Sequence, residues 1–199
     1  MISRASHFSV LAFVALLMLA SRAAEAHIMA GAALGGGFSA GFTHPLMGID
    51  HLLAMLSVGM WAAQTGGRSL WLAPLAFVAM MIVGGVLGMA GLGVSAFETG
   101  IAGSVIVLGF AIATAWRPSP LLGGSLCGLF ALFHGHAHGT EMAVTSSPVL
   151  YSFGFMLATG MLLSTGIGLA LSMRRFKIDH AAAWVGGGVA AIGCVLLLI

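Results

Sequence analysis

Long apolar segments, separated by short polar breaks, recur along this chain and leave it few ways to fold. Hydrophobic residues make up 60% of its 199 positions and charged residues only 6%, whereas about 25% of the residues in a typical soluble domain are charged. A helix needs about 20 predominantly apolar residues to cross the hydrocarbon core of a bilayer, and several segments approach or exceed that length. The sequence therefore predicts an all-α membrane protein that crosses the bilayer several times.

The first 26 residues have the pattern of a secretory signal peptide. Arg4 supplies a positive charge, the apolar core VLAFVALLMLA follows, and Ala-Glu-Ala forms a cleavage site of the small-x-small type. We expect cleavage after Ala26, which would make His27 the new N-terminus on the exported side. An uncleaved first helix is the alternative. A signal peptide of this kind indicates insertion into a bacterial inner membrane.

A single domain over residues 27–199 is predicted to form a six-helix transmembrane bundle. Residues 28–43, IMAGAALGGGFSAGFT, are too short and too rich in glycine for a full span, and we expect a half-helix or re-entrant segment there. Glycines four apart, as at Gly84 and Gly88, favour close helix packing in lipid, and Gly124 and Gly128 repeat the pattern. The predicted spans are 44–64, 70–90, 97–116, 119–143, 148–173 and 181–199.

The cations of the mature chain lie in three of the five breaks between these spans. These are Arg68, Arg117 and the group Arg174, Arg175 and Lys177. Because cytoplasmic connections carry the excess of Lys and Arg, six spans with both termini on the periplasmic side satisfy this rule. The net charge of +2 and the absence of a basic patch argue against nucleic-acid binding. No nucleotide-binding motif is present, which excludes direct ATP drive within this chain.

The polar chemistry is concentrated in two short motifs, HPLMGIDH at 44–51 and FHGHAHGTE at 133–141. In the second motif His134, His138 and Glu141 follow helical spacing and share one face, whereas His136 points nearly opposite. The fourth span is predicted to run outward, so the second motif falls in its outer third. The first motif opens a span that runs the other way, which brings both motifs to a similar membrane depth.

Counting along the two antiparallel helices predicts two layers of ligands. Seven residues separate His44 from His51, and seven separate His134 from Glu141, which is about 10.5 Å of helix. The deeper layer contains Asp50, His51 and His134, and the outer layer contains His44, His138 and Glu141.

Imidazole and carboxylate groups together suit nickel, cobalt, zinc or copper rather than magnesium or calcium. Ionisable residues within a membrane are costly and are functional by default, although such groups can also tie helices together by hydrogen bonds. Two further candidate ligands lie at the outer mouth. His27 would chelate through its α-amine and ring once cleavage exposes it. Glu98 opens the third span, where the helix dipole would also favour a carboxylate.

Both motifs resemble the signatures of the HupE/UreJ family of nickel permeases. Those signatures read histidine, five residues and Asp-His, then Phe-His-Gly-x-Ala-His-Gly-x-Glu, and the likeness extends over nearly the whole chain. The resemblance implies uptake of nickel, or of cobalt or another divalent ion, for hydrogenase or urease maturation. His136 occupies the variable position of the second signature. The residues that match the signatures are His44, Asp50, His51, His134, His138 and Glu141.

The sequence thus favours a permease, with the metal ion as cargo and no catalytic cofactor, and not an enzyme. The main alternative is an intramembrane metal-dependent hydrolase with its site near the periplasmic face. The zinc-protease signature His-Glu-x-x-His is absent, and no separate general base stands out. A metal sensor or storage protein is a third option, but no soluble output domain is present. The partners are the lipid bilayer and the metal ion, and a homo-oligomer is compatible with the sequence.

Overall fold

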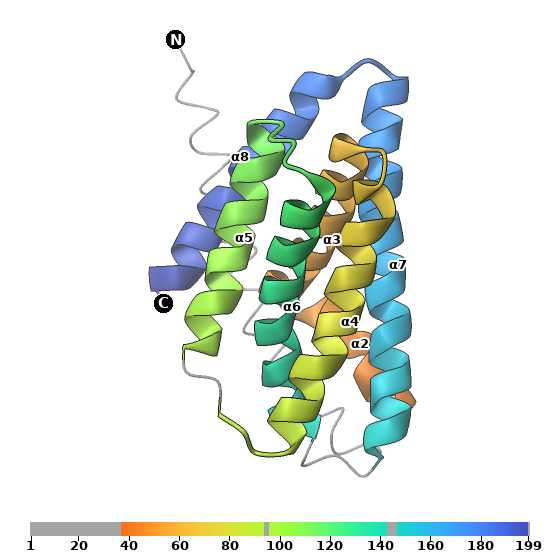
Figure 1. Ribbon diagram of the computed structural model, residues 1–199, viewed down its shortest axis with the longest axis vertical. Helices are drawn as coiled ribbons and strands as arrows, with labels where there is room; N and C mark the ends of the chain where they lie inside the picture. Colours follow the sequence, from red (N-terminus) through yellow and green to blue (C-terminus); the bar gives the residue numbers. More distant parts are fainter. Residues whose placement is uncertain (1–36, 94–95, 143–146, 199) are drawn as a thin grey trace.

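A computed structural model describes residues 37–93, 96–142 and 147–198, and this part of the chain contains seven α-helices and no strand (Figure 1). The predicted signal peptide, its cleavage site and His27 lie outside these residues. The all-α prediction is confirmed for the described part. The helices are α2 (Phe38–Met47), α3 (Ile49–Thr65), α4 (Ser69–Met89), α5 (Phe97–Ala113), α6 (Pro120–Met142), α7 (Pro148–Arg175) and α8 (Asp179–Leu198).

Three of the described helices, α4, α7 and α8, are long and apolar enough to cross a membrane. The pair α2 and α3 meets the same criterion as one broken span, which gives up to four. Helix α5 is apolar but has only 17 residues, and the polar motif at 133–141 lowers the hydropathy of the 23-residue α6. The helices α4 to α8 nevertheless coincide with the last five predicted spans to within three residues at each end.

The prediction of one continuous helix over 44–64 is wrong, because the chain breaks at Gly48. Helices α2 and α3 meet there at an angle of 81°, and Gly48 itself is extended, with φ −80° and ψ 117°. A Cβ at Gly48 would lie 3.0 Å from Asp50 Oδ1 and 3.2 Å from His51 Nδ1, so a side chain there would crowd both groups. The glycine-rich lead-in contributes residues 38–43 to α2, and this short helix carries His44.

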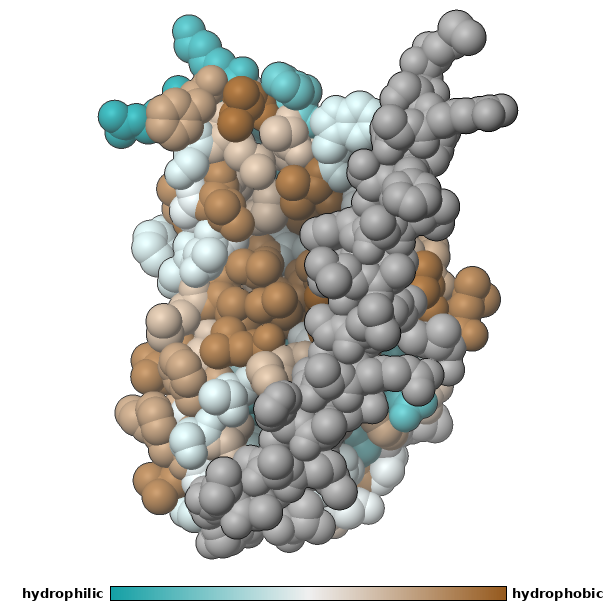
Figure 2. All heavy atoms as spheres, turned by 180° about the vertical axis from the view of Figure 1, so that it is seen from behind, coloured by the Kyte–Doolittle hydropathy of each residue, from teal (hydrophilic) through white to brown (hydrophobic). Residues whose placement is uncertain are grey.

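The connections between helices alternate between the two ends of the bundle. Those joining α3 to α4, α5 to α6 and α7 to α8 lie at the upper end in Figure 1, whereas the last turns of α4 and α6 and the first turns of α5 and α7 lie at the lower end. The upper connections contain or adjoin every Lys and Arg of the described residues. Figure 2 shows hydrophilic side chains at this end of one face and a broad hydrophobic surface below them. Positive charge is therefore concentrated at one end of the bundle.

Glycines of α4 and α6 bring the backbones of these two helices into direct contact. A Cβ at Gly135 would collide with the Met81 carbonyl oxygen, and one at Gly139 with the Gly85 oxygen. The contact is reciprocal, because a Cβ at Gly84 would collide with the α6 backbone. Small residues that admit such an approach are typical of helix contacts in membranes.

Of the two glycine pairs singled out by spacing, only one lies so close to a neighbouring backbone that an added Cβ would clash with it. Gly84 and Gly88 both face the α6 backbone, as predicted. Gly124 and Gly128 instead face side chains, with the nearest atoms, of Leu72 and Met80, at 3.1 Å from an added Cβ. The spacing alone could not separate these cases, because the partner of a small residue is set by tertiary packing.

We expect Gly135→Ala to lower the thermal stability of the protein in detergent and to reduce the fraction that elutes as a single species. Relieving the overlap with Met81 requires α4 and α6 to separate, and overpacking of this kind costs about 1–3 kcal/mol. The matched control is Gly160→Ala on α7, where an added Cβ meets nothing within 4 Å and helix propensity improves. Equal thermal midpoints for the two variants would contradict the packing assigned to Gly135.

Candidate metal site

The second histidine motif presents two different faces of α6. His134 and His138 are one helical turn apart, as are Gly135 and Gly139, so the motif makes a histidine stripe beside a glycine stripe. The glycine stripe contacts α4, which turns the histidine stripe towards α2 and α3. The glycines of the motif therefore fix the contact of α6 with α4, and as a result the neighbouring histidines face α2 and α3.

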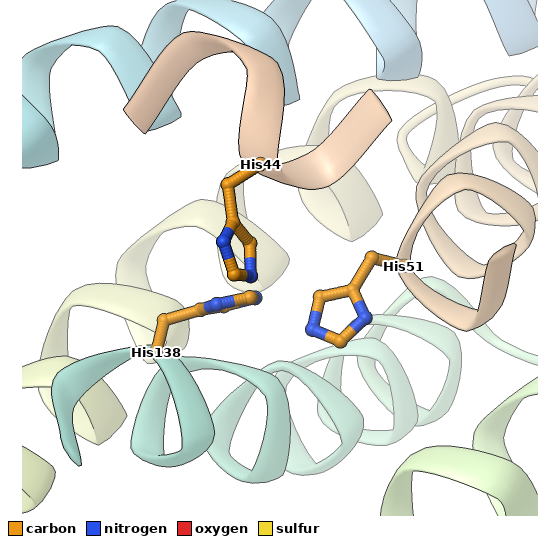
Figure 3. A group of neighbouring side chains, drawn as sticks. All are labelled: His44, His51 and His138. Carbon is orange, nitrogen blue, oxygen red and sulfur yellow. The ribbon is translucent and has the colours of Figure 1, made fainter. Parts of the chain in front are cut away.

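Three histidines from three helices converge at this point (Figure 3). His44 of α2, His51 of α3 and His138 of α6 each offer a ring nitrogen, and these nitrogens lie within 4.8 Å of one another. The ring of His138 lies between the other two, with centroid distances of 4.7 Å to His44 and 4.3 Å to His51. His51 and His138 are buried, and His44 is half-buried. We call these three residues the His44 group.

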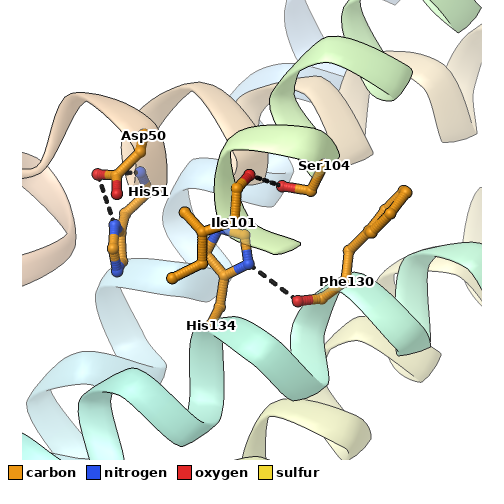
Figure 4. A network of polar contacts seen from close by, with 6 residues as sticks. All are labelled: Asp50, His51, Ile101, Ser104, Phe130 and His134. Carbon is orange, nitrogen blue, oxygen red and sulfur yellow. Dashed lines mark hydrogen bonds and ion pairs between the residues drawn. The ribbon is translucent and has the colours of Figure 1, made fainter. Parts of the chain in front are cut away.

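His134 extends the His44 group towards the centre of the bundle. It is completely buried, and its ring centroid lies 5.2 Å from that of His51. Its Nδ1 is 2.9 Å from the Phe130 carbonyl oxygen, and because a carbonyl only accepts, Nδ1 carries the proton (Figure 4). The lone pair of the neutral ring then lies on Nε2, which has no hydrogen-bond partner among the described residues. A buried acceptor of this kind is suited to bind a cation.

Asp50 contacts His51 and is not a member of the His44 group. Its Oδ1 accepts a hydrogen bond from the His51 backbone N–H at 2.8 Å and lies 2.6 Å from the His51 Nδ1 (Figure 4). A carboxylate in this position holds the proton on Nδ1 and leaves Nε2 as the ligand atom, an arrangement common behind metal-bound histidines. The side chain of Asp50 thus orients His51 and brings a negative charge beside the cluster.

The predicted two-layer spacing is wrong, although its pairings are present. His44 lies beside His138, and His51 beside His134, as the layers required. The rings of His44 and His51, however, are 6.0 Å apart instead of the about 10.5 Å expected for two turns of a continuous helix. The break at Gly48 is the reason, because it swings α2 by 81° and removes the helical rise between His44 and His51.

Aromatic side chains that the sequence did not single out enclose the cluster. Phe155 of α7 packs on His138 at 4.3 Å between ring centroids, and Tyr151, one turn before it, lies 6.0 Å from His44. Phe77 of α4 is 6.0 Å from His134. No local pattern distinguishes these three from other aromatic residues in apolar segments, so only the folded structure could identify them.

The remaining predicted ligands do not join the cluster in the described part of the chain. His136 is buried on the opposite face of α6, as expected, where its Nε2 is 2.9 Å from the Leu92 carbonyl oxygen. Glu98 lies exposed in the first turn of α5. Glu141 belongs to the last turn of α6, but its side chain, like the whole of His27, lies outside the described residues.

The donor set is rich in nitrogen, with the three imidazoles of the His44 group, a fourth imidazole at His134 and one adjacent carboxylate. Such sites bind late first-row divalent ions in preference to magnesium or calcium. Three helices, α2, α3 and α6, supply these groups within an otherwise apolar bundle, which is the setting in which ionisable residues mark an ion site.

Comparison with known proteins agrees with this chemistry. The family model described as HupE / UreJ protein matches residues 14–196, a range that includes both histidine motifs. Protein HupE of Rhizobium leguminosarum bv. viciae is 42% identical over 163 residues, which cover 82% of this chain and 85% of that protein. No solved structure matches the chain. The chain belongs to the HupE/UreJ family, which is associated with the transport of nickel and cobalt.

Proposed function

We propose that this protein is a permease of the bacterial inner membrane that imports a divalent transition metal, with nickel as the main cargo. The observation that carries the proposal is the convergence of four histidines inside an apolar helical bundle. The nitrogen donors fit nickel, cobalt, copper or zinc, and membership of the HupE/UreJ family favours nickel among them. Cobalt is the second cargo to test.

The proposed topology has six crossings and places the cation-bearing end of the bundle in the cytoplasm. Helices α3 to α8 each cross once, and α2 is a short re-entrant helix packed at the outer end. The alternation of the connections in Figure 1 and the positive-inside rule support this orientation. The N-terminus after cleavage behind Ala26, and the C-terminus, are then periplasmic, and His27, Glu98 and Glu141 would serve the outer mouth.

In the proposed mechanism a dehydrated ion passes between overlapping sets of ligands. The ion enters at His44 and His138, moves to the pair of His138 and His51, and then to His51 and His134. Each step keeps one imidazole in common, since neighbouring rings lie 4.3 to 5.2 Å apart. Shared ligands avoid the full cost of leaving an ion unpaired in a low dielectric, while incomplete coordination at each step leaves the ion free to move on.

The structure gives less support to a metal-dependent hydrolase. Such an enzyme needs a carboxylate or other base beside the metal-bound water, separate from the ligands. Of the carboxylates whose side chains are described, Asp50 is engaged with His51 and Glu98 is exposed on α5. A transport pathway requires only the ligands that the cluster contains.

Expression of the protein in cells that lack their own nickel uptake should raise nickel accumulation, measured by elemental analysis after growth with submicromolar nickel, cobalt, zinc or copper. His138→Ala should reduce that uptake at least about tenfold, because it removes the ring shared by the first two steps. His180→Ala, at an exposed histidine of α8, is the matched control and should leave uptake unchanged. Accumulation of none of the four metals would refute the permease.

Replacing Asp50 tests whether it orients His51 or binds the metal directly. Asp50→Ala removes both the charge and the acceptor for His51 Nδ1, and it should weaken nickel binding by the purified protein about 10- to 100-fold. Asp50→Asn retains an acceptor oxygen and should bind better than the alanine variant in the same calorimetric titration. Thr43→Val, whose hydroxyl bonds only within α2, is the control. Equal losses for the two Asp50 variants would favour direct coordination.

A double-mutant cycle tests whether His51 and His134 share an ion. If they do, the losses of nickel affinity in His51→Ala and His134→Ala should be strongly non-additive, because the second change removes part of a site already damaged. The control cycle pairs His51→Ala with His136→Ala, on the opposite face of α6, and should be additive. Additive losses in both cycles would rule out a shared ion at His51 and His134.

A further inference from the structure

A hollow that is partly open to its surroundings lies between α4, α6 and α7 beside the histidine cluster. Its inner side is made by side chains that are almost fully buried, among them Met81, His138 and Phe155. Its rim on α4 is made by Ile82 and Val86, which are 52% and 54% exposed. The hollow therefore runs from the outer surface of the bundle to one wall of the His44 group. We call it the lateral slot.

The rim of the lateral slot faces the interior of the membrane. Ile82, Val86 and Met89 are spaced i, i+4 and i+7, so they share one face of α4. Helix α4 has 21 residues and is apolar enough to cross the bilayer. At 1.5 Å per residue its length of about 31 Å matches a hydrocarbon core of about 30 Å. The rim, in the last eight residues of α4, thus lies in hydrocarbon, in the leaflet at the cation-poor end.

Water is a poor occupant of the lateral slot. A buried water needs two to four polar partners, whereas apolar cavities stay dry. Only His138 and Ser152 among the lining residues have polar side chains. The His138 ring packs against His44 and His51, and the Ser152 hydroxyl already donates to the Pro148 carbonyl oxygen. An empty hollow would forfeit the dispersion contacts of its lining. A flexible apolar chain supplied by the surrounding bilayer restores them.

We propose that an acyl chain of a phospholipid in this leaflet occupies the lateral slot and forms the wall of the histidine cluster against His138 and Phe155. Occupation of the slot depends only on the position of α4 in the membrane. The role of the chain as a wall of the metal pathway rests on the proposed function. In this role the acyl chain excludes water from the side of His138 that faces the slot. The metal ion then reaches the cluster from the end of the bundle, past His44.

The direct test uses the full chain in vesicles of phosphatidylglycerol and phosphatidylethanolamine that contain a phospholipid with a diazirine on one acyl chain. After illumination, mass spectrometry maps the labelled residues. Lipid at the outer surface alone can label the exposed Ile82 and Phe153. Occupation of the slot also labels Met81, which is only 3% exposed. The matched control is Met55 on α3, which is fully buried and not part of the slot.

The expected result is labelling of Met81 at least about tenfold above that of Met55. Labelling of Ile82 and Phe153 with Met81 no higher than Met55 would overturn the proposal. That pattern would also result if a second copy of the protein or another segment of this chain filled the slot. Because this wild-type comparison involves no metal, its failure is distinguishable from failure of the permease, which is judged by uptake alone.

A blocking variant provides the second measurement. Met156→Trp, at a half-buried position in the slot, should reduce labelling of Met81 to the level of Met55 and leave Phe153 unchanged. Leu157→Trp, at the exposed neighbouring position, should leave Met81 labelling unchanged. Persistence of Met81 labelling in a folded Met156→Trp variant would show that lipid reaches Met81 by another route and would overturn the proposal.

Discussion

The backbone contact between α4 and α6 is the constraint on which the geometry of the cluster depends. Helix pairs in lipid gain little from the hydrophobic effect and rely on close packing instead. Gly135 and Gly139 allow the α6 backbone to rest on that of α4, which fixes the rotation of α6 about its own axis. Because His134 and His138 immediately precede these glycines, the same contact decides where their rings point.

Two of the rings, those of His51 and His134, are further oriented by an acceptor that holds one ring nitrogen. Asp50 contacts Nδ1 of His51, and the Phe130 carbonyl contacts Nδ1 of His134. In both cases the lone pair of the ring is left on Nε2, which would arrange the proposed metal site before an ion arrives. Preorganised ligands lower the ordering cost of binding. In a permease this has to be balanced by incomplete coordination, and a row of adjacent imidazoles meets both requirements.

The break at Gly48 gives the first motif a geometry different from that of a continuous helix. Within a straight helix, His44 and His51 would be separated by about 10.5 Å along the axis. With α2 turned by 81°, both rings reach His138 from different directions. The five residues between His44 and Asp50 therefore contain a bend and do not form a continuous stretch of helix. Neighbouring aromatic side chains then close the space that the bend creates.

The sequence alone predicted that the chain is helical, where α4 to α8 begin and end to within three residues, and that the two histidine motifs come together. Apolar segments, their breaks and the alternation of cations are one-dimensional signals, so they can be read without coordinates. The bend at Gly48, the approach of His51 to His138 and the enclosure by Phe77 and Phe155 required the tertiary structure. These features depend on contacts between helices distant in sequence, which leave no periodic pattern in the chain.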